Sequence, residues 1–195
     1  MLAVSEKADS YALISLASAK AALGIVGETE DTAIEDFIDR ASDVIARHCN
    51  RVLALETVIE QFRLDCHRND LLLSRYPVAS IVSIVEDGRA LSASDYEVVS
   101  SNGILSRLHG DSPRRWPAGK IVVTYSAGFE VEDVPPALQQ ACLQLVKAYY
   151  IGADRDPLVR SESVTPMSSA SYFIGDAEHL PPDVRGLLKQ YRKIR

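Results

Sequence analysis

The chain changes its hydrophobic periodicity twice, and this pattern constrains its fold more than any other feature. Apolar residues recur every three or four positions from Thr32 to Arg51, which predicts an amphipathic helix. From Thr57 to Tyr125 short runs rich in β-branched residues are separated by turn residues, which predicts strands. At Pro135-Pro136 the helical spacing returns. The order indicates antiparallel strands inserted between helices, not a parallel βαβ protein.

The sequence predicts four helices, at Leu16–Leu23, Thr32–Arg51, Pro136–Ile151 and Pro182–Arg192. Ser15 and Gly24 bracket the first as N-cap and C′ residues. Thr32 and Glu35 can form a capping box at the start of the second. Two apolar stripes are expected to pack on each other, Ile34, Phe37, Ile38, Ala41, Val44 and Ile45 on one helix and Leu138, Ala141, Cys142, Leu145, Val146 and Tyr149 on the other.

Six runs in the middle of the chain are candidate strands, TVIEQFRL, LLLS, SIVSIVE, YEVVS, GILSRL and KIVVTYS. Asp87-Gly88 and Asn102-Gly103 are hairpin signals between them. The predicted fold class is therefore α+β, a helical bundle core with an inserted antiparallel β unit and a C-terminal arm ending in a helix. We expect a single domain over residues 1–195. Its parts are the N-terminal helices (13–55), the β insertion (57–128), the core helix (134–152) and the arm with its helix (153–195).

Composition excludes several classes of function. The 195 residues are 47% hydrophobic and 25% charged, as expected of a soluble globular protein. The net charge of -6 argues against wrapping nucleic acid with most of the surface. No apolar run of 18 residues predicts a membrane span, and no secretion signal is evident. Three scattered cysteines without CxxC spacing fit a reducing compartment.

Catalytic, cofactor-binding and metal-binding residues are not predicted. His48-Cys49 and Cys66-His67 resemble zinc half-sites, but adjacent side chains diverge on a helix or strand and do not chelate one ion easily. The acidic residues at the start of the second helix are typical of a first helical turn. One alternative is an enzyme built from scattered residues such as Asp65, His67 and Asp95, which would need a deep pocket.

The last predicted helix is basic in an otherwise acidic chain. A solvated helix, a helix docked on a partner protein and direct contact with nucleic acid are the alternatives. A second alternative function is therefore a small nucleic-acid-binding module that uses this helix. The serine-rich stretch SESVTPMSSASYFIGD before it is either a flexible linker or a segment that orders on a partner.

A resemblance favours the docked helix. The ordered series LISLASAKAALGI, DTAIEDFIDRASDVIARHCNR, LSRYPVASIVSIVEDG, WPAGKIVVTYSAGF, VPPALQQACLQLVKAYY and LPPDVRGLLKQYR resembles the head–tail connector (adaptor) proteins of long-tailed bacteriophages and gene transfer agents. The resemblance runs from about Leu13 to Arg192, while the first dozen residues depart from it.

The resemblance implies a structural subunit, not an enzyme, and no cofactor. Such adaptors form a dodecameric ring beneath the portal, extend the DNA channel toward the tail stopper, and are found in the neck of the virion or phage-like particle after assembly in the bacterial cytoplasm. DNA passes through the lumen without sequence-specific binding, and no membrane is involved. The expected portal-binding residues lie on the last helix, Arg185, Leu187, Leu188, Tyr191 and Arg192.

Overall fold

The computed structural model describes residues 1–153, 161–165, 168–171 and 180–193. Within these ranges the chain divides into two compact units. The β unit contains Met1–Ser10 and Val52–Glu130, and the helical unit contains Tyr11–Arg51 and Val131–Arg195. The helical unit is thus made of two separate stretches of chain, and most of the β unit is inserted between them.

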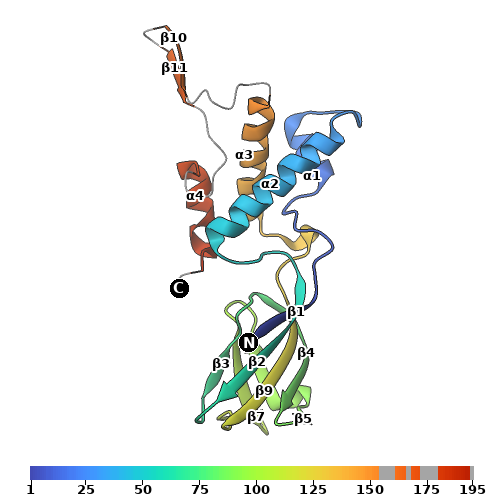
Figure 1. Ribbon diagram of the computed structural model, residues 1–195, viewed down its shortest axis with the longest axis vertical. Helices are drawn as coiled ribbons and strands as arrows, with labels where there is room; N and C mark the ends of the chain where they lie inside the picture. The colour runs from blue at the N-terminus through green and yellow to red at the C-terminus, as the bar shows by residue number, and fades with distance from the viewer. Residues whose placement is uncertain (154–160, 166–167, 172–179, 194–195) are drawn as a thin grey trace. The chain divides into compact units, whose positions relative to one another are not determined.

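The β unit consists of two antiparallel sheets (Figure 1). The larger has the strand order β1-β2-β9-β4-β5, and the smaller has the order β3-β7-β6 with β8 also paired to β7. Their bounds are β1 Leu2–Glu6, β2 Glu56–Leu64, β3 Asp70–Leu72, β4 Val78–Glu86, β5 Arg89–Ala90, β6 Tyr96–Val99, β7 Ile104–His109, β8 Ser112–Arg114 and β9 Gly119–Ala127.

One apolar cluster joins the two sheets. Every second residue of β9 is buried in it, including Ile121, Val123 and Tyr125, as strand alternation requires. Leu71 and Leu105 from the smaller sheet complete the same cluster, together with the fully buried Trp116. The inner faces of the sheets therefore bury each other.

This core makes the fold-class prediction wrong in its central statement. The chain is not a helical bundle carrying a β insertion, because the β segment has a hydrophobic core of its own and the described residues form more strands than helices. Strand periodicity shows which face of a strand is buried but not what covers it. The strand pattern therefore did not reveal a second sheet, whose inner face covers the larger one. The α+β class remains compatible with this architecture.

A buried carboxylate ties the loop before β4 to the larger sheet. Glu60 on β2 accepts hydrogen bonds from the Ser74 amide (2.9 Å), the Ser74 hydroxyl and the Tyr125 hydroxyl (2.8 Å). The Arg75 amide in turn donates to the Tyr125 hydroxyl (3.1 Å). Such a charged group is tolerated in a core because its oxygens are paired.

The helical unit contains α1 (Leu16–Leu23), α2 (Asp31–Cys49), α3 (Pro136–Gly152) and α4 (Pro182–Leu188). α2 packs on α3, α1 packs on both, and α4 packs on α3. The six residues predicted for the α3 stripe are all buried. On α2, Phe37 is only half-buried, while the buried Ser42 accepts a hydrogen bond from the Leu13 amide (3.0 Å).

The predicted ends of the helices are confirmed at α1 and wrong at the start of α2. Ser15 and Gly24 cap α1 as expected, and Gly24 has a φ of 73°. The capping box of Thr32 and Glu35 does not form, because α2 begins one residue earlier and Glu30 is its N-cap without a side-chain hydrogen bond. Asp31 instead pairs with Lys20 on α1.

Three strands of the β unit, β1, β5 and β8, were not predicted. The serine-rich stretch contains a hairpin of β10 (Ser161–Thr165) and β11 (Ser168–Ser171). The alternatives for this stretch, a linker or a segment that orders on a partner, concern residues that lie partly outside the described ranges, at 166–167 and 172–176.

Candidate partner-binding surface on the C-terminal helix

The last helix begins at a double proline and lies on the helical unit. Pro182 occupies the first turn of α4, where a missing N–H costs no hydrogen bond. Leu180, Val184 and Leu188 are buried, and the chain continues through a 3-10 turn, Lys189–Tyr191. The Lys193 amide then donates to the carbonyl of Cys49 at the end of α2 (2.8 Å). The described end of the chain is thus fixed to its own unit.

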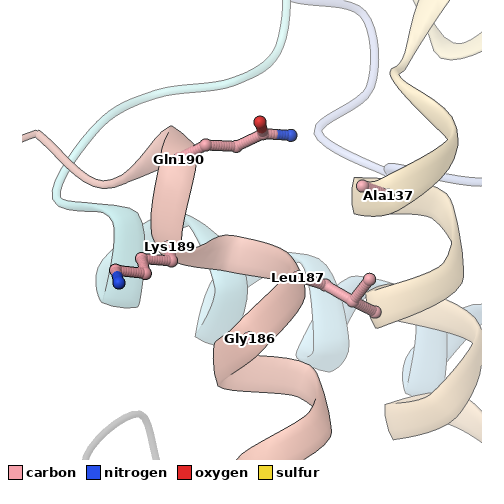
Figure 2. A pocket seen from close by; sticks show the side chains of 5 residues that line it. All are labelled: Ala137, Gly186, Leu187, Lys189 and Gln190. Atoms are coloured by element: carbon pink, nitrogen blue, oxygen red, sulfur yellow. The ribbon is translucent and has the colours of Figure 1, made fainter.

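The five predicted partner-binding residues fall into three environments. Leu188 is fully buried and belongs to the core of the helical unit. Arg185 and Arg192 are exposed, and Tyr191 is half-buried. Leu187 is half-buried and points toward α3 (Figure 2). The sequence left open whether the helix lies on its own core or on a partner, and the structure shows contact with α3.

An open hollow of about 550 Å³ lies between α3 and α4. Its lining is Ala137, Gly186, Leu187, Lys189 and Gln190. Figure 2 shows Leu187 and Gln190 on the side that faces Ala137, whereas Lys189 points the other way. The hollow contains no acid or histidine in its lining, so it suits an apolar contact and not acid–base chemistry. Sequence reasoning missed it, because Ala137 and Gly186 become neighbours only when the two helices pack.

Arg185 and Arg192 leave α4 with positive charge on its exposed side. Within the described ranges neither side chain makes an ion pair. Burial raises the pKa of the Cys49 thiol to about 11, although the nearby charges of Arg51 and Arg192 favour its thiolate. Exposed cations of this kind contribute to the rate and specificity of association with acidic surfaces.

The three residues suggested for an enzyme site, Asp65, His67 and Asp95, are either exposed or engaged in structural contacts. Asp65 and His67 are exposed between β2 and β3. Asp95 accepts a hydrogen bond from the Ser92 amide (2.9 Å) and lies 3.6 Å from Arg107. That backbone hydrogen bond, helped by Arg107, holds the pKa of Asp95 below its usual value. Its carboxylate therefore serves a 3-10 turn and an ion pair.

The cysteine pairs likewise lack the geometry of a metal site. Cys49 and Cys142 are buried, and Cys66 is exposed. Among the described residues no three His, Cys, Asp or Glu side chains are grouped as metal ligands would be. None of the helices in the described ranges is both long and apolar enough to cross a bilayer.

The fold is similar to chains in three solved structures. They are "Virion of native gene transfer agent (GTA) particle" (TM-score 0.60, 18% identity), "Neck of empty GTA particle computed with C6 symmetry" (0.59, 18%) and "Neck of native GTA particle computed with C12 symmetry" (0.59, 17%). Each match covers 100% of this chain and 96% of the other. At this identity the likeness establishes a shared fold. No curated protein sequence matches the chain.

A family model described as "Head completion protein" matches residues 12–194. The match includes all four helices and eight of the nine strands of the β unit, and it leaves β1 outside. It confirms the predicted structural role in connecting the head and tail of a phage-like particle, and with it the prediction that the chain is not an enzyme. The chain belongs to the head completion protein family.

Proposed function

We propose that the chain is one subunit of a dodecameric ring in the neck of a phage-like particle. The ring lies beneath the portal, extends the DNA channel and meets the tail stopper on its other side. The observation that carries this proposal is the family match over residues 12–194. The twelvefold symmetry of a neck that contains a similarly folded chain supports the number of subunits. In this role residues 1–195 act together as a single adaptor domain.

The lumen of such a ring must let DNA slide. A net charge of -6 suits this task, because an acidic wall repels the phosphate backbone, whereas a basic wall would retain it and release counterions. We therefore expect DNA to pass without sequence-specific contacts.

The exposed side of α4 is the proposed contact with the portal. Arg185 and Arg192 supply charge for the approach, and Tyr191 supplies an aromatic side chain of the kind enriched at binding hot spots. Leu188 supports this surface from inside the unit. Because α4 is held on α3, the surface is ordered before the portal binds, which lowers the entropic cost of docking.

The test is assembly with portal rings. The protein is mixed with purified portal and the complexes are examined by co-sedimentation and electron microscopy, which should show a collar on one face of the portal. The double variant Arg185→Glu with Arg192→Glu should lose co-sedimentation. Lys147→Glu, an exposed cation on α3, is the matched control and should bind normally. Wild-type protein that forms no collar on the portal would refute the proposal.

A further inference from the structure

The loop between α1 and α2 contains an exposed apolar side chain, Val26. Val26 is 98% exposed, although its loop is fixed by several contacts. Before it, the Ile25 amide donates to the Lys20 carbonyl (3.0 Å); after it, the Lys20 ammonium binds the Gly27 carbonyl and the Asp31 carboxylate. A single exposed apolar residue is ordinary. Here, however, the backbone on both sides of it is held in place, so a partner that buries Val26 would pay little to order the loop.

The hollow between α3 and α4 is concave where Val26 protrudes, and its lining is also largely apolar. Gly186 has no side chain, and a Cβ built there would meet no atom within 4 Å. A glycine inside a helix costs about 0.5–1 kcal/mol relative to alanine. With the small Ala137 opposite, this glycine leaves open an apolar space that α4 itself does not fill.

The two features lie on opposite sides of the helical unit. Figure 1 shows α4 on one side of the α2–α3 pair and α1, with the loop that follows it, on the other. The charges around them are complementary. Glu28 and Glu30 follow Val26 and are exposed, whereas α4, which forms one wall of the hollow, carries the exposed cation Lys189 on the side turned away from Ala137 (Figure 2).

We propose that Val26 of one copy inserts into the hollow of the next copy, with Glu28 reaching across α4 toward the cationic side on which Lys189 lies. A contact between two different surfaces of the same chain is heterologous, and repeated with a suitable rotation it closes into a ring. The inference rests on the proposed function, because it assigns which surfaces face each other between ring subunits.

Two substitutions test the contact without disturbing the fold. Val26→Asp changes a side chain that has no cover, and Gly186→Leu fills the hollow from within. Burying a valine contributes enough that each change should lower the association constant between copies by about tenfold or more. Ile151→Asp is the control, because Ile151 is also apolar and 63% exposed in the same unit. Native mass spectrometry measures association, and urea unfolding confirms that every variant is folded.

Mixed cysteine variants test the pairing directly. In a Cys66→Ser background, chains carrying Val26→Cys are mixed with chains carrying Gln190→Cys and oxidised. Disulfides should form between the two kinds of chain at least about tenfold above a control mixture of Ile151→Cys with Gln190→Cys, and neither kind should link to itself to that extent. Cross-linking no higher than the control would overturn the inference.

Electron microscopy of the same samples separates this inference from the proposed function. Rings without the specific disulfide would overturn this contact and leave the ring role intact. The specific disulfide in samples that never form rings or collars would support the contact and count against the proposed function.

Discussion

Gly128 is the position where a single added methyl group should be most destructive. Its φ is +117°, a conformation that costs an ordinary residue about 1–3 kcal/mol. A Cβ at this position would lie 2.2 Å from the carbonyl oxygen of Ala54. Because that atom is backbone, the clash cannot be relieved by rotating a side chain.

The magnitude follows from the hydrogen bonds that must break when the two segments separate. Two hydrogen bonds join these segments: the Phe129 amide donates to the Leu53 carbonyl (2.8 Å), and the Leu55 amide donates to the Phe129 carbonyl (3.0 Å). At about 0.5–1.5 kcal/mol each, their loss adds about 1–3 kcal/mol. Together with the conformational cost, Gly128→Ala should lower the free energy of unfolding by about 2–6 kcal/mol, a large part of the stability of a typical domain.

Urea unfolding followed by tryptophan fluorescence measures this effect. Trp116 is the sole tryptophan and is fully buried in the β unit, so its emission reports on that unit. Gly110→Ala is the matched control, because Gly110 also has a positive φ (+54°) but no atom near its missing Cβ. The control should cost only about 1–2 kcal/mol. Equal losses in the two variants would refute the close approach at Gly128.

Three further predictions concern the two cores and the thiols. Leu145→Ala should destabilise the helical unit by about 2–5 kcal/mol, while Phe37→Ala should cost less because its ring is half-exposed. Unfolding followed by circular dichroism measures both losses of stability, and equal losses would contradict the difference in burial between the two side chains. Glu60→Gln should destabilise the β unit by about 1.5–3 kcal/mol, because it removes the charge that three donors share; unchanged Trp116 unfolding would show that the network contributes nothing. Burial raises the pKa of Cys49 to about 11 and that of Cys142 to about 12, so both thiols stay protonated at neutral pH. A maleimide should therefore modify only the exposed Cys66 until urea unfolds the protein, and mass spectrometry after a short exposure counts the labels.

The sequence predicted those parts of the fold that depend on local spacing. All six residues of the α3 stripe are buried because a three- and four-residue spacing places side chains on one side of any helix. The prediction that one face of β9 is buried was correct for a similar reason, because successive side chains of a strand point to opposite faces. Gly24 at the end of α1 was predictable because a left-handed C-cap favours glycine.

Features that depend on pairing between distant segments were not predictable. β1 is exposed on both faces, so its five residues show no alternation between core and solvent. It forms a strand because its backbone pairs with β2, and that partner cannot be read from the residues of β1. The prediction of a capping box at α2 was wrong, because the helix already begins at Asp31. The ion pair of Asp31 with Lys20 comes from another helix, so the residues near Thr32 do not reveal it. The partner-binding residues were predicted on α4, but which of them would be buried depended on how α4 packs, and Leu188 faces inward.

The position of α4 explains how so short a helix can present the surface that we propose as the contact with the portal. A helix of seven residues is marginal in water on its own. Burial of Leu180, Val184 and Leu188 on the helical unit supplies the missing stability. The same packing fixes the direction of the side chains that remain outside. Because Gly186 and Leu187 are presented from a helix held at several points, the hollow keeps its shape without a partner. A surface of this kind can assemble by docking and does not have to fold on contact.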